Sequence, residues 1–173
     1  RDRLKDWGAD RNISVSATST VKINERRVSS TWIREALANS EFKLAAQLLG
    51  RPYTFSGKVV YGNQLGRSIG IPTANLWMPK QRLPVQGVFA VKCKLGNKNL
   101  FGIANMGTRP TVDGESPVLE VHLFDFDQYI YGQRIEIEFI KKIRDERKFD
   151  NINLLKQQIH TDIDIAKDTL KLI

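Results

Sequence analysis

Beyond Pro52 the chain consists of short β-type runs separated by turns, and this pattern limits the folds that it can adopt. In the last run, Ile135, Ile137 and Phe139 alternate with charged residues, which is typical of a half-buried strand. Glycine, proline and asparagine stand between the runs and favour turns there. We therefore expect strands near residues 53–61, 88–95, 98–105, 117–126 and 133–140.

An amphipathic helix is predicted after the strands. Apolar residues recur there at steps of three and four, at Ile152, Leu155, Ile159, Ile163, Ala166 and Leu170. This spacing indicates about five helical turns, with Asp150 as the expected cap. Five or six antiparallel strands followed by one long helix predict a mainly β fold, a closed barrel with the helix packed outside.

A polar segment and two short helices are predicted upstream. Residues 1–28 are polar, with a strand-like alternation from Ile13 to Val21. Residues 30–39 and 41–49 favour helices, and the second of these has Ser40 as its expected N-cap and Gly50 as its end.

The charge of the chain raises nucleic acid as a partner. There are 27 basic and 19 acidic residues, a net charge of +8. The excess is spread out, with 9 basic against 6 acidic residues in 1–50 and 15 against 10 in 51–150, and no dense basic run. A diffuse positive field also suits an enzyme whose substrates carry phosphates. We expect small-molecule substrates and no nucleic-acid partner, with a non-catalytic basic barrel that binds nucleic acid as the alternative.

Cysteine content and hydropathy point to a cytoplasmic protein. Cys93 is the only cysteine, which excludes a disulfide framework, and its place between two lysines predicts a small buried residue. No stretch approaches the ~18 apolar residues of a membrane span, and the start lacks the apolar core of a secretion signal. We expect no membrane partner. Because the chain starts with Arg1 rather than Met, we expect a fragment.

A glycine-bracketed loop that runs into Thr73 and Asn75 carries the clearest chemistry. Gly62, Gly66 and Gly70 allow tight turns whose N–H groups can converge on an anion. Thr73 and Asn75 offer neutral oxygen ligands on one face of an extended segment. A phosphate cradle beside hard oxygen ligands suits a magnesium–nucleotide complex, although the loop is not a Walker A sequence. As an isolated turn it would be structural.

Glu120 is the candidate general base. In the strand predicted over 117–126 it shares a face with His122 and apolar residues, where a carboxylate is costly unless it is paired or functional. Phosphoryl transfer needs a group that deprotonates the acceptor hydroxyl. The alternative is a glutamate at the barrel rim, paired with an arginine. His122 and His160 are predicted to be packed, hydrogen-bonded residues, which argues against a histidine metal site.

A series of ordered segments resembles a known family. Pro72-Thr73-Ala74-Asn75 with its preceding glycines is the most specific of them, and the others lie at 87–91, 105–111, 119–126, 131–132 and 143–149. In this order and spacing, residues 50 to 170 resemble the riboflavin kinase module of bacterial bifunctional riboflavin kinase/FAD synthetase. Upstream, the segment from Arg27 to Arg34 is similar to the end of the FMN adenylyltransferase module of the same proteins.

The resemblance implies a six-stranded barrel and a division of the chain at residue 50. Residues 1–50 would be the end of the adenylyltransferase domain with linker helices, and residues 51–173 would be the riboflavin kinase domain. The implied reaction converts riboflavin and ATP to FMN and ADP with Mg²⁺. The implied partner is the N-terminal adenylyltransferase module of the same protein.

The resemblance also assigns residues. It implies that Glu120 is the catalytic base, that Thr73 and Asn75 hold the magnesium, and that Arg144 contacts the flavin. The residues that it places at ATP and its phosphates are Gly62, Gly66, Arg67, Gly70, Pro72, Thr73 and Asn105.

Other interpretations of these segments stay open. The residues alone also allow a local Pro-Thr turn at Thr73, a structural turn at 105–111 and a solvated charged run around Arg144. The aromatic residues Phe89, Phe101, Phe124 and Phe126 are predicted to be core residues rather than flavin stackers.

The upstream match implies ATP contacts that this chain does not complete. In the family, Arg27, Ser30, Thr31 and Arg34 would contact ATP during adenylyl transfer; here they could equally cap the helix at 30–39. The chain has no closely spaced histidine pair, so we expect no FAD formation. A flavin-binding regulatory domain is a further alternative, and intact Thr73, Asn75 and Glu120 argue against it.

Overall fold

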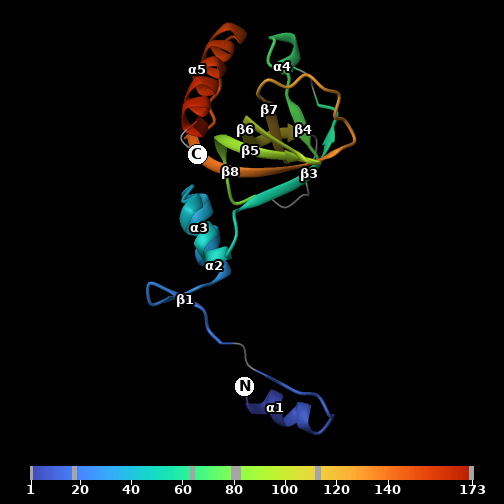
Figure 1. Cartoon of the computed structure of the whole chain (residues 1–173), viewed down its shortest axis with the longest axis vertical. Coiled ribbons are helices and arrows are strands. Elements are labelled where there is room, and N and C mark those ends of the chain that lie inside the picture. The colour runs from blue at the N-terminus through green and yellow to red at the C-terminus, as the bar shows by residue number, and fades with distance from the viewer. Residues whose placement is uncertain (1, 17–18, 63–64, 79–82, 112–113, 172–173) are drawn as a thin grey trace. The chain divides into compact units, whose positions relative to one another are not determined.

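The computed structural model describes residues 2–16, 19–62, 65–78, 83–111 and 114–171 (Figure 1). The chain divides into two compact units, residues 1–30 and residues 31–173. The first unit holds helix α1 (Asp2–Ala9) and a short antiparallel ribbon of β1 (Lys22–Ile23) and β2 (Arg26–Arg27). The sequence did not indicate α1. The alternation predicted from Ile13 to Val21 forms no strand among the residues described there.

The two predicted helices near residue 40 are confirmed as α2 (Ser30–Ala38) and α3 (Phe42–Leu49). Gly50 ends α3 with φ of 70°, the left-handed conformation that glycine adopts without strain. The predicted cap is wrong. Ser40 has φ of 60°, its N–H bonds to the Leu37 carbonyl, and the next N–H bonds to the Ala36 carbonyl. These two hydrogen bonds close the end of α2, so Ser40 terminates one helix instead of starting the next.

Six antiparallel strands close into a barrel in the order β3-β4-β7-β6-β5-β8, which confirms the predicted fold class. The strands are β3 (Thr54–Val60), β4 (Ala74–Leu76), β5 (Gly87–Leu95), β6 (Lys98–Thr111), β7 (Gly114–Leu123) and β8 (Arg134–Arg144). The short helix α4 (Leu65–Ser68) lies in the connection from β3 to β4. Strand β4 was not among the predicted runs, because a strand of three residues is too short to show an alternating pattern.

The turn predicted from Asn105 to Thr111 is wrong, because β6 continues through it. Strand β5 pairs with β6 as far as Met106, and beyond that point the register continues with β7 alone, from Gly107 opposite Val118 to Thr111 opposite Gly114. A proline has no N–H to donate and is tolerated in a strand that pairs on one side. Glycine and proline therefore mark a projecting hairpin here instead of a turn.

Alternate residues of the strands face the barrel interior, where Phe89, Leu119, Val121, Ile135 and Ile137 are fully buried. Each such side chain contributes roughly 1.5–3 kcal/mol when it leaves water. Helix α3 extends this core, because the ring of Phe42 lies 5.8 Å from that of Phe89 and 5.9 Å from that of Phe139.

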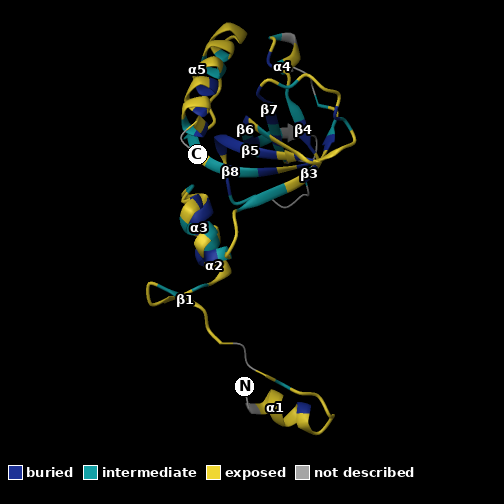
Figure 2. Ribbon diagram, viewed as in Figure 1, coloured by how far each residue is buried: buried dark blue, intermediate teal, exposed yellow. Residues whose placement is uncertain are grey.

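Helix α5 (Ile152–Lys171) packs on the outside of the barrel, as predicted. Its residues Ile163, Ala166 and Leu170 cover Val88, Ala90 and Ile103, which point outward from β5 and β6. Figure 2 shows the buried residues of α5 on the side that faces the strands. The predicted cap is one residue off: the helix starts at Ile152, and the Leu154 N–H donates to Oδ1 of Asn151 at 3.0 Å.

The predicted burial of single residues is mostly confirmed. Cys93 is buried, and burial raises the pKa of its thiol to about 12. Phe89 and Phe124 are buried and Phe126 is half-buried, whereas Phe101 is 44% exposed. Phe101 points outward from β6, and α5 covers Ile103 on that face but not Phe101. None of the described helices is long and apolar enough to cross a membrane.

Candidate active site

The strand register aligns the polar residues of the barrel's outer face. Asn75 of β4 is opposite Glu120 of β7, Glu120 is opposite Asn105 of β6, and Asn105 is opposite Val88 of β5. Val88 is in turn opposite Arg144 at the end of β8. Because the flanking Leu119 and Val121 fill the interior, this row points outward. Residues that are 69 positions apart in sequence therefore share one surface.

A cavity of about 490 Å³, here called the large cavity, opens on this row. One wall is the outer face of the barrel, and the opposite wall is formed by α5 and the segment before it. Of the predicted site residues, it is lined by Gly66, Thr73, Asn105, Glu120 and Arg144.

Glu120 combines both interpretations that the sequence allowed. It lines the large cavity, and Oε1 accepts a hydrogen bond from the Arg109 guanidinium at 3.1 Å. The side chains of Arg109 and Glu120 are 40% and 29% exposed, so water screens this ion pair. Glu120 is therefore held at the cavity wall by an ion pair that is weak enough to open.

The glycine-bracketed loop is shaped by close approaches. A Cβ at Gly62 would collide with the side-chain amide of Asn75, and one at Gly66 would collide with the Ile71 carbonyl. Gly70 has φ of 80°. Asn75 is only 7% exposed and lies beneath Gly62. Glycine at 62 thus lets the loop lie against β4, and glycine at 66 and 70 allows its tight turn.

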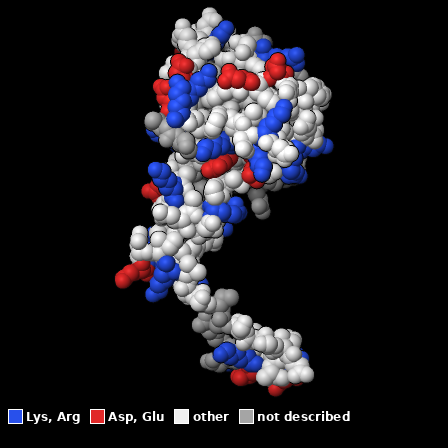
Figure 3. Space-filling view, in the orientation of Figure 1, with Lys and Arg blue, Asp and Glu red and all other residues white. Residues whose placement is uncertain are grey.

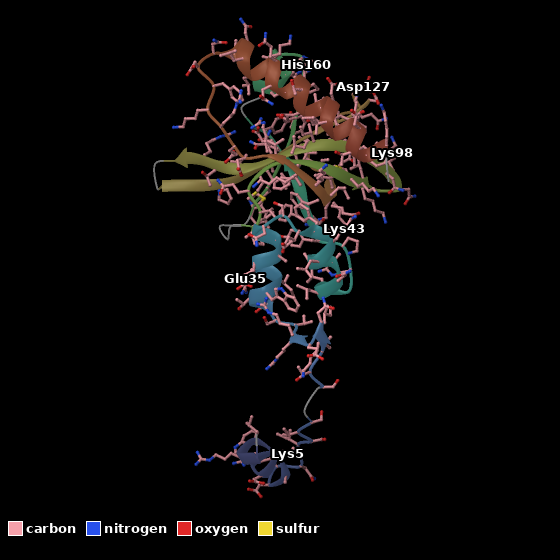
Figure 4. All side chains as sticks on the ribbon, turned by 90° about the vertical axis from the view of Figure 1, so that its left-hand side faces the viewer. Lys5, Glu35, Lys43, Lys98, Asp127 and His160 are labelled. Atoms are coloured by element: carbon pink, nitrogen blue, oxygen red, sulfur yellow. The ribbon has the colours of Figure 1, made fainter. Side chains whose placement is uncertain are left out.

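The histidine predictions are half right. Nδ1 of His122 donates to the Pro72 carbonyl at 2.8 Å, which ties the loop to β7, and His122 is half-buried as predicted. His160 is exposed on α5 rather than packed (Figure 4). The helix turns His160 outward because the apolar stripe passes through Ile159 and Ile163.

A second cavity of about 400 Å³, here called the tyrosine cavity, lies on the other side of Thr73. It is lined by Arg67, Pro72, Thr73 and the segment from Phe126 to Tyr131. Tyr61 stacks on Tyr131 with ring centroids 4.1 Å apart, and its hydroxyl shares a hydrogen bond with that of Tyr129, which raises the pKa of Tyr129. Sequence analysis placed Tyr131 in one of the family-like segments but gave none of these tyrosines a role in a site. Three of the four tyrosines gather here, and the only signal in the sequence was that Tyr129 and Tyr131 stand close to Gly132.

Arg144 is held by α5. Its Nε donates to both carboxylate oxygens of Asp162, at 3.1 and 2.8 Å, and its NH2 lies 2.7 Å from Oδ2. Asp162 is 1% exposed and also accepts from Gln158 at 2.7 Å. Sequence analysis missed Asp162. A charge in the apolar stripe of the terminal helix, three residues after Ile159, was the available signal.

A glutamate from the segment after β8 fills a notch in β6. Oε1 of Glu146 accepts from the Asn105 amide at 3.3 Å, and Oε2 accepts from Gln86 at 3.4 Å. A Cβ at Gly107 would collide with this carboxylate, so glycine makes the notch. Phe149 follows, with the guanidinium of Arg147 4.5 Å from its ring centroid. Both Glu146 and Phe149 line the large cavity and were not predicted.

The remaining predicted residues lie elsewhere. Arg27, Ser30, Thr31 and Arg34 are exposed and line neither cavity. Within the described part of the chain, His, Cys, Asp and Glu form no metal-binding group of three. On the face shown in Figure 3, basic and acidic side chains are intermixed over the barrel unit.

A family model described as flavokinase, riboflavin kinase, matches residues 49–170, which include the barrel, both cavities and nearly all of α5. The chain belongs to the riboflavin kinase family. The match begins at Leu49, the last residue of α3, and ends at Leu170, one residue before the end of α5.

The relatives are bifunctional proteins. The chain is 53% identical over 146 residues to the bifunctional riboflavin kinase/FMN adenylyltransferase of Haemophilus influenzae, covering 84% of this chain and 47% of the relative. It is 46% identical over 160 residues to that of Escherichia coli K12, covering 92% and 51%. The chain thus spans about half the length of the curated relatives that it matches.

A solved structure shares the arrangement of the riboflavin kinase domain. A Streptococcus pneumoniae protein described as a macrolide-efflux protein superposes with a TM-score of 0.78 and 35% identity, over 96% of this chain and 54% of that one. The likeness extends beyond the family match at the N-terminal side.

Proposed function

We propose that this riboflavin kinase domain transfers the γ-phosphoryl group of ATP to the 5′-hydroxyl of riboflavin, giving FMN and ADP. The observation that carries the proposal is the position of Glu120 and Thr73. Glu120 lines the large cavity, and Thr73 lies in the walls of both cavities. Two substrates held in the two cavities would meet there, as a direct transfer requires.

The large cavity suits the flavin. Its volume falls within the ~300–1,000 Å³ typical of ligand pockets. The apolar part of its lining, which would take the ring, is Ile69, Ile71, Val88, Ile103, Leu155 and Ile159. Arg144 and Glu120 are three strand spacings apart along the row, about 14 Å between backbones. The ring near Arg144 and Phe149 would leave the ribityl chain to reach Glu120.

The tyrosine cavity suits ATP. The rings of Tyr129 and Tyr131 offer flat apolar surfaces for the base, and Arg67 offers a positive charge for the phosphates. The turn from Gly66 to Gly70 would bring backbone N–H groups to the triphosphate. Pro72 and Thr73 would then lie between the nucleotide and the flavin. Gly62 acts by making room for Asn75.

The oxygen donors near Glu120 fit magnesium. A hydroxyl from Thr73 and an amide oxygen from Asn75 are hard ligands, and Asn75 is opposite Glu120 in the sheet. Magnesium bound by Thr73 and Asn75 would offset the negative charge on the phosphate oxygens. Asn105, on the other side of Glu120, would orient the substrate through its amide.

Glu120 acts as the general base. Its carboxylate takes the proton of the 5′-hydroxyl as that oxygen forms its bond to the γ-phosphorus. The bond between the γ-phosphorus and the oxygen that bridges to the β-phosphate breaks, and ADP leaves with that oxygen. Arg109 orients the carboxylate before substrate binds, through its 3.1 Å hydrogen bond.

In the intact protein we propose a second activity, FMN adenylyltransferase, as in the bifunctional relatives. Residues 1–50 would be the end of that module, with Arg27, Ser30, Thr31 and Arg34 at its ATP. In this chain α2 begins at Ser30, and the compact unit with the barrel starts at residue 31. The chain alone should make no FAD, because the histidine pair that the family uses is absent from it.

An end-point assay tests the function. The chain is incubated with riboflavin, ATP and magnesium, and the flavins are separated. FMN without FAD supports both halves of the proposal, whereas no FMN contradicts the kinase and steady FAD contradicts the assignment of residues 1–50. Salt-dependent binding of oligonucleotides without FMN formation would favour the nucleic-acid alternative instead.

A further inference from the structure

A partly buried polar cluster borders the large cavity at its α5 end. It consists of Arg144, Asp162 and Gln158, and the proposed function uses only Arg144. Asp162 is the most deeply buried charged residue in the described part of the chain, with 1% exposure. Its neighbours in the stripe of α5, Ile159, Ile163 and Ala166, are apolar.

An aspartate is a costly choice at this position. Burying an ion pair is often no more stabilising than an apolar residue of similar size, because both charges lose their water. The stripe of α5 would pack on the barrel with an apolar residue at 162 as well. Stability therefore does not explain Asp162, and the direction of its hydrogen bonds offers another explanation.

These hydrogen bonds fix the plane of the Arg144 guanidinium. Nε and NH2 both donate to the Asp162 carboxylate, which is the two-point contact that orients an arginine. NH1 donates to the Asp145 carbonyl at 2.9 Å. Gln158 in turn holds Asp162 from one helical turn away. The other N–H groups of NH1 and NH2 donate to no other group among the described residues and remain for a ligand in the cavity that Arg144 lines.

Asp162 also sets the charge of this wall. The guanidinium of Arg144 lies 5.7 Å from the ring centroid of Phe149, so the pair borders the aromatic part of the cavity. A carboxylate bonded to that guanidinium leaves the Arg144–Asp162 pair without net charge. A ligand with an uncharged aromatic ring would meet oriented hydrogen-bond donors at this wall. A phosphate group would gain little electrostatic attraction, because Asp162 balances the charge of Arg144.

We propose that Asp162 is a positioning residue for the flavin ring. It holds the Arg144 guanidinium in one plane, so that the free N–H groups of Arg144 meet the polar edge of the ring. This inference rests on the proposed function. It makes α5 part of the substrate site instead of a support for the barrel alone.

The test compares Asp162→Asn with Asp164→Asn, a matched control two residues along the same helix that is exposed. In Asp162→Asn the KM for riboflavin should rise about 10-fold to 100-fold, the range expected when a substrate contact is misplaced. The kcat at saturating riboflavin and the KM for ATP should stay within about twofold, because Glu120 and the tyrosine cavity are untouched. Quenching of riboflavin fluorescence should show the same weakening without turnover.

A second variant keeps the test decisive if Asp162→Asn does not fold. Gln158→Met removes one hydrogen bond from Asp162 but leaves the ion pair, and should raise the KM for riboflavin about threefold. An unchanged KM for riboflavin in a folded variant overturns the inference, and so does a fall in kcat alone. If the unmodified chain forms no FMN, the proposed function fails and this inference fails with it; FMN formation with unchanged KM overturns this inference only.

Discussion

The two ends of the large cavity each carry an arginine–carboxylate pair, and the two pairs differ in burial. At the α5 end, the side chains of Arg144 and Asp162 are 20% and 1% exposed. At the other end, those of Arg109 and Glu120 are 40% and 29% exposed. A buried pair is costly to separate, whereas an exposed pair opens readily. The comparison indicates one rigid and one adaptable ion pair; under the proposed function, the rigid pair would border the flavin ring and the adaptable pair would lie where the proton moves.

The largest effect is expected at the adaptable end. Glu120→Gln keeps the shape of the side chain but cannot accept the proton, so the rate of FMN formation should fall by ~10²–10⁴. Riboflavin binding, measured by fluorescence quenching, should stay within a few-fold, since the ring end is unchanged. A variant with nearly the parent rate would remove Glu120 from the mechanism.

The next largest effect is on stability, which should fall more when Arg144 is replaced than when Arg109 is replaced. Arg144→Met leaves the Asp162 carboxylate buried with Gln158 alone, and should lower the free energy of unfolding by ~3–5 kcal/mol. Arg109→Met removes an exposed partner, and should lower it by at most ~1 kcal/mol. Urea unfolding followed by circular dichroism measures both. Equal losses would break the comparison between the two ends.

Metal use should change with a smaller effect. Thr73→Ala removes a hydroxyl from the wall that the two cavities share, and should weaken the apparent affinity for magnesium by at least about tenfold. Magnesium titrations at fixed ATP and riboflavin measure this, with Thr161→Ala on the exposed side of α5 as the control. Normal magnesium dependence in Thr73→Ala would place the metal at other residues.

The last prediction concerns Cys93, which lies at neither end of the large cavity. Burial raises the pKa of the Cys93 thiol to about 12, so the reactive thiolate is scarce at pH 8. A disulfide reagent should label Cys93 quickly in urea and hardly at all in the folded protein. Rapid labelling of the folded protein would mean that the barrel opens at β5.

Periodicity predicted the fold because strands and the terminal helix bury regular faces. Glu120 was found for a similar reason, as a carboxylate on an apolar strand face. Asp162 follows the same rule on a helix, but the apolar stripe around it drew the interpretation toward packing. The row from Asn75 to Arg144 could not be predicted, because the register of non-neighbouring strands is set by the closed barrel. Arg109 and Glu146 reach their partners only through that register.

Thr73 lies in the walls of both cavities, and this has a stereochemical consequence. If the flavin and the nucleotide each occupy one cavity, the entering and leaving oxygens approach the same phosphorus from opposite sides. The phosphoryl group is then transferred in one step, without a phosphorylated protein intermediate. The arrangement of its three other oxygens about the phosphorus inverts as the new bond forms. A γ-phosphoryl group made chiral with oxygen isotopes should therefore appear in FMN with inverted handedness.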